Sequence, residues 1–274
     1  MLNREEELRF CKARRAAIAL DYQNLNPEQR RAALATEGPL LLLAGAGSGK
    51  TTVLVNRIAN LIRFGSAHSS TYAPQGAGPE QVAELERLLH SGGEPSEALR
   101  PFLREHTVRP YNVLAITFTN KAAGELKNRL SAMLGEAGQD VNASTFHSAC
   151  VRILRREAGR LGYPQSFTIY DTDDQQRAMK EVYKSMNIDD KFLPLKSAIG
   201  AIGRLKDKMI SPQDAMSAPA DTRAGLVAKV YDAYQKRLLQ AGAFDFDDLI
   251  YATVKLLRDF EDVREYYQNR FRYI

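Results

Sequence analysis

The sequence has no tryptophan, only two cysteines and no long hydrophobic run. Cys11 and Cys150 form neither a disulfide framework nor a metal-ligand spacing, which indicates a reducing compartment. No apolar segment approaches the roughly 20 residues that cross a bilayer, and the start, MLNREEELRF, does not resemble a secretory signal. We therefore expect a cytoplasmic protein, and neither a disulfide-rich secreted domain nor a membrane-spanning one.

The composition is that of an ordinary globular protein. Its 274 residues are 44% hydrophobic and 26% charged, enough for one large or two ordinary domains, and we find no internal repeat. Lysine and arginine exceed the acids by 38 to 33, giving a net charge of +5 and a pI near 9.1. This excess fits an anionic partner but does not require one.

The most informative stretch is Leu40 to Thr52, LLLLAGAGSGKTT. Its four leucines have no polar alternation, which predicts a parallel strand buried on both faces. Gly45, Gly47 and Gly49 can turn successive N–H groups toward phosphate oxygens. The following helix, predicted from Lys50 to about Ile62, presents its positive end to the same anion.

This stretch predicts a nucleotide site with magnesium. Lys50 would reach the β- and γ-phosphates, and the Thr51 hydroxyl would bind Mg²⁺. Ala44 stands where the phosphate-loop pattern has its first glycine, and the alternative is a chance glycine-rich turn between strand and helix. The expected ATP-binding residues of the loop are Ala44, Gly45, Ala46, Gly47, Ser48, Gly49, Lys50, Thr51 and Thr52.

Gln29 lies just upstream, in a predicted helix start. Asn26 as N-cap, Pro27 at the first helical position and Gln29 at the third make a good capping sequence. Structural capping explains Gln29 fully. The functional alternative is that its amide pairs with the N6 and N7 edge of adenine, which needs one donor and one acceptor.

Two segments carry no assigned chemistry. Residues 1–24 predict a charged helical extension, and residues 66–108 predict an inserted excursion with a helix over 80–89. Three histidines fall in the excursion, too scattered to argue for a metal site: His68, His90 and His106.

Further strands alternate with helices. Apolar runs at 113–119, 141–145 and 167–170 each precede a helical pattern, which predicts an α/β fold with a doubly wound parallel sheet. Ligands bind beyond the carboxyl ends of such strands. We therefore expect three loops on one rim: 44–51, 117–121 and 145–147.

The second and third of these loops have the chemistry of a nucleic-acid surface. Hydroxyl and amide groups there can contact a phosphodiester backbone, and two phenylalanines can stack on unpaired bases. The alternatives are that Asn120 or Thr119 only caps a helix and that the rings belong to the core. The residues concerned are Thr117, Phe118, Thr119, Asn120, Lys121, Thr145, Phe146 and His147.

The rest of the chain is predicted to be helical. Residues 171–243 contain no convincing strand and resemble a helical insertion. Asp247 and Asp248 open a helix after LLQAGAF, which is not an apolar strand, so we interpret them as helix caps rather than as the metal-binding acid of an ATPase. Residues 272–274 predict the start of one more strand.

The motifs together resemble superfamily 1 DNA helicases of the UvrD, PcrA and Rep family. The resemblance covers residues 25–274 apart from the 66–108 excursion. It rests on five segments in the same order: LNPEQ at 25–29, AGAGSGKT at 44–51, AITFTNKAAGEL at 115–126, STFHSACVRILRR at 144–156 and FDFDDL at 244–249.

The resemblance implies a RecA-like P-loop ATPase domain, called 1A, over 25–170 and 244–274, with a helical subdomain 1B over 171–243. It implies that Gln29 recognises adenine, that the phosphate loop, with Lys50 and Thr51 as its catalytic members, binds ATP and Mg²⁺, and that the two rim loops bind single-stranded DNA. Such proteins move 3′ to 5′ on DNA at single-strand to duplex junctions, in repair or replication. Thr52 stands where the family often has Arg or Lys.

The resemblance also implies that residues 1–274 are an N-terminal piece. The family's Asp-Glu (Walker B) box would follow the strand that opens at residues 272–274. A chain without that box and the second, C-terminal motor domain would lack most of the machinery of ATP hydrolysis. We therefore expect the parent protein to be an ATP-dependent helicase and this chain alone to be inactive.

Three other functions remain open. One is the motor subunit of a recombination helicase-nuclease, and another is a P-loop kinase, which would need an acceptor pocket near the loop. The third is a non-catalytic single-strand-binding module that uses nucleotide as a switch.

Overall fold

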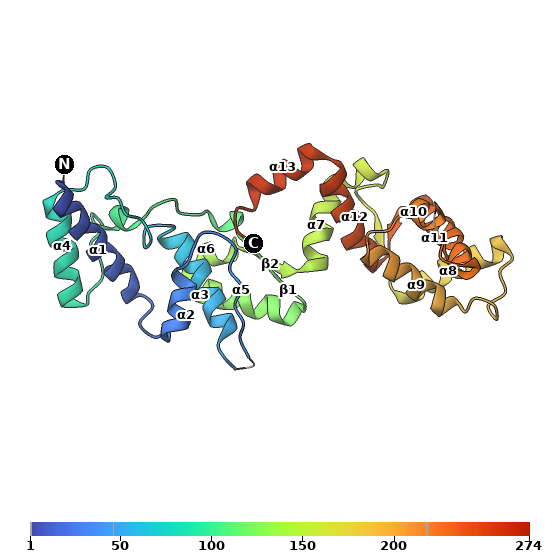
Figure 1. The fold of residues 1–274 in the computed structure, drawn as a ribbon, viewed down its shortest axis with the longest axis horizontal. Coiled ribbons are helices and arrows are strands. Elements are labelled where there is room, and N and C mark those ends of the chain that lie inside the picture. Colours follow the sequence, from blue (N-terminus) through green and yellow to red (C-terminus); the bar gives the residue numbers. More distant parts are fainter. Residues whose placement is uncertain (1, 46, 218) are drawn as a thin grey trace. The chain divides into compact units, whose positions relative to one another are not determined.

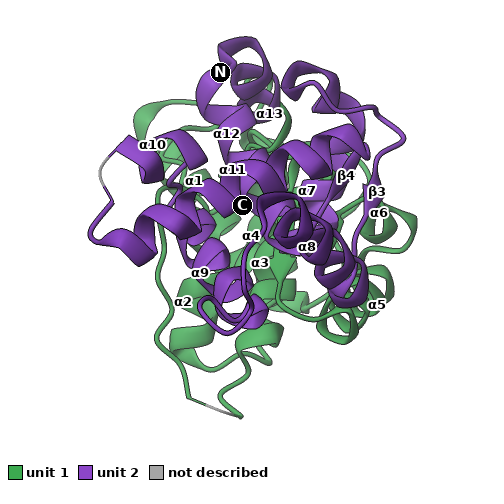
Figure 2. Cartoon of the chain, turned by 90° about the vertical axis from the view of Figure 1, so that its right-hand side faces the viewer, with its two compact units in different colours: residues 1–143, 270–274 green, residues 144–269 purple. Residues whose placement is uncertain are grey.

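Helices make up most of the structure, a computed structural model that describes residues 2–45, 47–217 and 219–274 (Figure 1). The chain divides into unit 1, residues 1–143 with 270–274, and unit 2, residues 144–269 (Figure 2). Within the described ranges, no helix is both long and apolar enough to cross a membrane.

Unit 1 is built around α3 (Lys50–Arg63), which packs against α2 (Pro27–Leu34) and α5 (Asn120–Leu134). Apolar residues of α3 and α5 share a core with β1 (Leu114–Thr117) and its flanking residues. The glycine-rich loop leads into the first turn of α3, and this core holds the helix in place. The remaining elements are α1 (Arg4–Leu20), α4 (Pro79–Ser91), η1 (Arg100–Leu103), η2 (Pro110–Asn112), α6 (Glu136–Gln139) and β2 (Asn142–Thr145), which forms a two-stranded sheet with β1.

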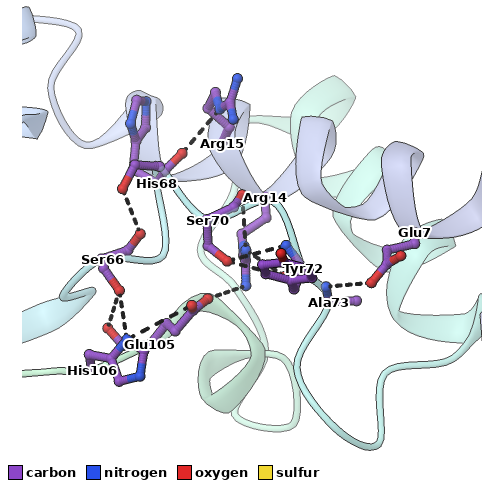
Figure 3. Close-up of polar contacts among 11 residues, drawn as sticks. Glu7, Arg14, Arg15, Ser66, His68, Ser70, Tyr72, Ala73, Glu105 and His106 are labelled. Carbon is purple, nitrogen blue, oxygen red and sulfur yellow. Dashed lines mark hydrogen bonds and ion pairs between the residues drawn. The ribbon is translucent and has the colours of Figure 1, made fainter.

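The predicted helical extension is confirmed as α1, which packs on α4 of the excursion. Arg14 of α1 is fully buried. Its guanidinium lies 3.3 Å from the Glu105 carboxylate and donates to the carbonyl of Tyr72 at 2.9 Å (Figure 3). A buried cation with these partners ties the extension to both ends of the excursion.

The predicted strand over Leu40–Leu43 is wrong. Residues 39–45 form no strand, and Leu41 and Leu43 are 80% and 89% exposed. Leu40 and Leu42 line a cavity of about 580 Å³ together with residues of β1 and Tyr273. Because a buried strand needs a hydrogen-bonded neighbour, a leucine run that pairs with none of the described strands stays extended and exposed. Tyr273 forms a single parallel bridge with Val113, so the predicted strand start at 272–274 is confirmed only at that residue.

Unit 2 is predominantly helical (Figure 2). Its short strands β3 (Thr168–Ile169) and β4 (Ala243–Phe244) pair in parallel, with Thr168 opposite Ala243 and Ile169 opposite Phe244. Its helices are α7 (Phe146–Glu157), η3 (Ala158–Leu161), α8 (Thr172–Met186), α9 (Leu195–Asp207), α10 (Pro212–Ser217), α11 (Thr222–Gln240), α12 (Phe246–Asp259) and α13 (Glu261–Arg270).

The α/β class is confirmed, and the arrangement of strands differs from the prediction. The described strands form two separate two-stranded sheets in place of one doubly wound sheet. The statement that LLQAGAF is no strand is wrong for its last two residues, which are β4. Two residues are too few for an apolar pattern, so only their long-range pairing with β3 makes them a strand.

Candidate functional site

The glycine-rich loop leads directly into α3. Gly47 and Gly49 have φ angles of 77° and 82°, in the left-handed region that glycine adopts without strain. Gly49 is the N-cap of α3 and provides no side-chain cap, so the first N–H groups of the helix stay available to an anion. Ala46 lies outside the described residues.

Lys50 folds back onto this loop. Its Nζ donates to the carbonyl oxygens of Ala44 at 3.1 Å and Gly45 at 2.5 Å. The neighbouring Thr51 is exposed in the first turn of α3. An ammonium, a hydroxyl and free helix N–H groups are the donor set that a magnesium-bound polyphosphate needs, so the residues present fit that ligand.

Gln29 lies against the loop and uses both ends of its amide. Its Oε1 accepts from the N–H of Asn26 at 3.2 Å, which completes the predicted capping box. Its Nε2 donates to the carbonyl of Ser48 at 2.9 Å. The capping prediction is therefore confirmed, and both hydrogen-bonding ends that adenine would need are engaged within the chain.

In unit 1, the predicted nucleic-acid residues follow β1. The Thr119 hydroxyl accepts from the N–H of Ala122 at 3.1 Å, so it caps α5 as the structural alternative required. Phe118 is 87% exposed, which excludes the core alternative for this ring. Asn120 and Lys121 are exposed beside it, and Thr117 is half-buried.

In unit 2, the corresponding residues are Thr145, the last residue of β2, and the first two residues of α7. The Thr145 hydroxyl caps α7 by accepting from the N–H of Ser148 at 3.2 Å. Phe146 and His147 are both exposed at the start of α7. Phe146 is therefore no core residue, and the polar cap and the exposed rings occupy adjacent positions.

Phe246 is a residue that the sequence analysis missed. It opens α12, is 51% exposed, and meets the His147 ring edge-on at a centroid distance of 6.0 Å. Two exposed rings from different helices thus form one surface, to which we refer as the His147–Phe246 surface. An aromatic residue between two aspartates at a helix start was the available sequence signal.

Beneath this surface is a buried ionic cluster, also missed from sequence. Lys206 of α9 is 2% exposed, and its Nζ lies 2.8 Å from Asp245 Oδ2 and 2.9 Å from Asp248 Oδ1. Asp245 is the N-cap of α12 and accepts from the Asp248 N–H at 2.8 Å, while the Asp248 carboxylate accepts from the Asp245 N–H at 3.3 Å. The predicted capping role is therefore confirmed for Asp248, and the N-cap itself is Asp245, not Asp247. The sequence signal was a lysine in the apolar stripe of Ala198 and Ile202.

The charges in this cluster do not balance, because two carboxylates face one ammonium. Burial, more than the charge of neighbouring Asp245, raises the pKa of Asp248 to about 7. Although burial opposes it, Lys206 nearby lowers the pKa of Asp245. The cluster therefore favours one ionised carboxylate and one that takes up a proton near neutral pH.

Comparisons with known proteins agree with these motifs. The UvrD/REP helicase N-terminal domain family matches residues 25–71 and 97–274. An ATP-dependent DNA helicase PcrA from Staphylococcus epidermidis is 44% identical over 252 residues, which are 92% of this chain and 29% of that protein. A Staphylococcus aureus protein of the same name is 43% identical over 251 residues, with the same shares of each chain.

The chain spans 29% of the length of each of these two relatives, less than a third. The family match excludes residues 1–24 and 72–96, which contain α1 and most of α4. The matched part contains the glycine-rich loop, the segments after β1 and β2, and the acidic start of α12. The chain belongs to the UvrD/REP helicase N-terminal domain family.

Proposed function

We propose that this chain is the ATP-binding and single-stranded-DNA-binding part of an ATP-dependent 3′ to 5′ DNA helicase that acts in DNA repair or replication. The proposal rests chiefly on the loop at the start of α3, where two glycines with left-handed backbone conformation precede Lys50 and Thr51. The PcrA name of its relatives supports the same activity.

ATP with Mg²⁺ supplies the free energy for movement along DNA when it is bound. The loop N–H groups and Lys50 would hold the phosphates, with Lys50 exchanging the carbonyls of Ala44 and Gly45 for phosphate oxygens. Thr51 would bind the metal ion. Gln29 would recognise adenine after releasing its contact with Ser48.

Each unit offers candidate DNA contacts of its own. Phe118 in unit 1 and the His147–Phe246 surface in unit 2 offer rings to unpaired bases, and Lys121 offers a charge to the backbone. The partners would be single-stranded DNA, its junctions with duplex, and a second motor domain. In this division, subdomain 1A comprises residues 25–170 and 244–274, subdomain 1B comprises 171–243, and the protein acts in the cytoplasm.

The test is binding of the 274-residue chain to a fluorescent single-stranded oligonucleotide and to the matched duplex, over a series of salt concentrations. We expect tighter binding to the single strand, weakening as salt rises because cations are released from the backbone. Phe118→Ala should weaken single-strand binding by about tenfold, the value of one stacked base.

The matched control is Phe192→Ala, which removes a ring that is 63% exposed but lies outside the family's DNA motifs. It should leave single-strand affinity within about twofold of the unmodified chain. Equal affinity for single strand and duplex in a folded chain would contradict the proposal, as would equal losses in the two variants.

A further inference from the structure

The inserted helices and α12 converge on one buried point in unit 2. Asp245 Oδ2 accepts from Lys206 of α9, from Tyr234 of α11 at 3.0 Å and from Gln175 of α8 at 3.1 Å. Asp248 accepts from Gln235 of α11 at 3.1 Å. Three helices within residues 171–243, namely α8, α9 and α11, therefore donate hydrogen bonds to the first turn of α12 and its N-cap.

Lys206 is the centre of this arrangement. Its ammonium contacts both carboxylates, and it lies 5.4 Å from the centroid of the Tyr234 ring and 5.9 Å from that of Tyr231. Burying a lysine ammonium costs free energy unless the ammonium is paired with an opposite charge. Lys206 and the two aspartates therefore hold one another in position. The relation ties α9 to the N-cap and to the third residue of α12.

A second contact of α9 with the same turn is independent of charge. A Cβ atom placed on Gly203 would lie 2.9 Å from Asp247 Oδ2. Gly203 thus allows α9 to approach the residue that follows Phe246. Gly203 and Lys206 lie about one helical turn apart on α9. Both contact the first turn of α12, which carries Phe246 of the His147–Phe246 surface.

We propose that Lys206 is a positioning residue for nucleic-acid binding, which holds the first turn of α12 so that Phe246 stays against His147. This inference rests on the proposed function. In this arrangement the helical insertion supports the His147–Phe246 surface. A displacement of α9 would therefore move Phe246. The ion pair between Lys206 and Asp245 fixes the backbone next to Phe246. Phe246 then contacts the unpaired base.

The test compares Lys206→Met with Arg237→Met in the full chain. Arg237 pairs with Glu181 at 2.7 Å, also between inserted helices, but both side chains are exposed and the pair lies away from α12. Two measurements are made on each folded variant: affinity for a single-stranded oligonucleotide, and hydrogen exchange of the amides of residues 246–249.

Lys206→Met should weaken single-strand affinity by about tenfold and raise amide exchange in this turn by a similar factor. Arg237→Met should change neither by more than about twofold. A purely structural role would lower the melting temperature of Lys206→Met and leave the affinity of the folded chain unchanged. Matching affinity and exchange in the two variants would overturn the proposal.

If Lys206→Met does not fold, Asp248→Asn decides the question. Asparagine keeps an oxygen for the Asp245 N–H and leaves Lys206 paired with Asp245 alone, so no buried charge is uncompensated. Its single-strand affinity should fall by about threefold, and unchanged affinity would overturn the proposal. If the unmodified chain binds no single strand, the proposed function fails, and exchange at residues 246–249 still decides whether Lys206 positions this turn.

Discussion

The Gln29 side chain donates to the carbonyl of Ser48 at 2.9 Å and so joins the start of α2 to the glycine-rich loop. The same amide accepts from Asn26 at the N-cap. One residue thus performs two separable tasks, one in capping a helix and one in holding the loop.

Gln29→Glu separates these tasks. A glutamate keeps the acceptor for the Asn26 N–H but cannot donate to Ser48 at neutral pH. We expect the melting temperature to change little and the affinity for ATP with Mg²⁺ to fall by about tenfold, the value of one lost hydrogen bond of about 1.4 kcal/mol. Isothermal titration calorimetry measures the affinity. Unchanged ATP affinity would show that the side-chain N–H of Gln29 has no role in nucleotide binding.

Gly49→Ala should damage the phosphate loop. Alanine would have to adopt the φ angle of 82°, and its Cβ would lie 2.7 Å from Gln29 Nε2. We expect a loss of about 1–2 kcal/mol in the free energy of unfolding and weaker ATP binding. Gly159→Ala is the control, because its Cβ would meet no atom within 4 Å and it lies outside the glycine-rich loop. Equal effects of the two substitutions in urea unfolding and calorimetry would refute the argument.

Asp248 should make stability depend on pH. Because burial raises the pKa of this acid to about 7, the folded chain binds its proton more tightly than the unfolded chain does. This stabilisation is complete in acid below the unfolded pKa and is lost as the pH rises through 7. Between about pH 5 and pH 8, the free energy of unfolding should fall by about 2 kcal/mol relative to Asp248→Asn.

Urea unfolding followed by circular dichroism measures both chains at each pH. The comparison removes the contributions of the histidines, since these are common to both proteins. Lys206 and Asp245, the charged groups nearest Asp248, titrate outside this range, because the pKa of the lysine is raised and that of Asp245 is lowered. A difference between the two chains that stays constant with pH would show that Asp248 does not change protonation there.

Arg14→Met should destabilise unit 1. The substitution leaves Glu105 without its buried partner and frees the Tyr72 carbonyl (Figure 3). Breaking a buried pair costs about 3 kcal/mol. Arg15→Met removes an exposed side chain with one bond to the His68 carbonyl at 3.0 Å, and should cost under about 1 kcal/mol. Thermal unfolding compares the two, and equal losses would exclude Arg14 as the anchor of α1.

Local features follow from short stretches of the chain. Asn26 and Thr119 cap the helices that their types and positions predicted, because a cap bonds to N–H groups only two or three residues away. Gly47 and Gly49 after the leucine run have the left-handed backbone that glycine permits, whereas Gly45 does not adopt it. The family followed from motifs of this local kind.

Contacts between distant segments depend on how the chain folds and could not be predicted from local patterns. The run Leu40–Leu43 has the composition of a buried strand, but pairing with a neighbouring strand is what forms one, and it pairs with none of the described strands. Lys206 lies 39 residues from Asp245 in the sequence, so no local pattern predicts their contact. Helix caps are settled within one turn of chain, whereas strand pairing and buried charge pairs depend on which distant segments meet.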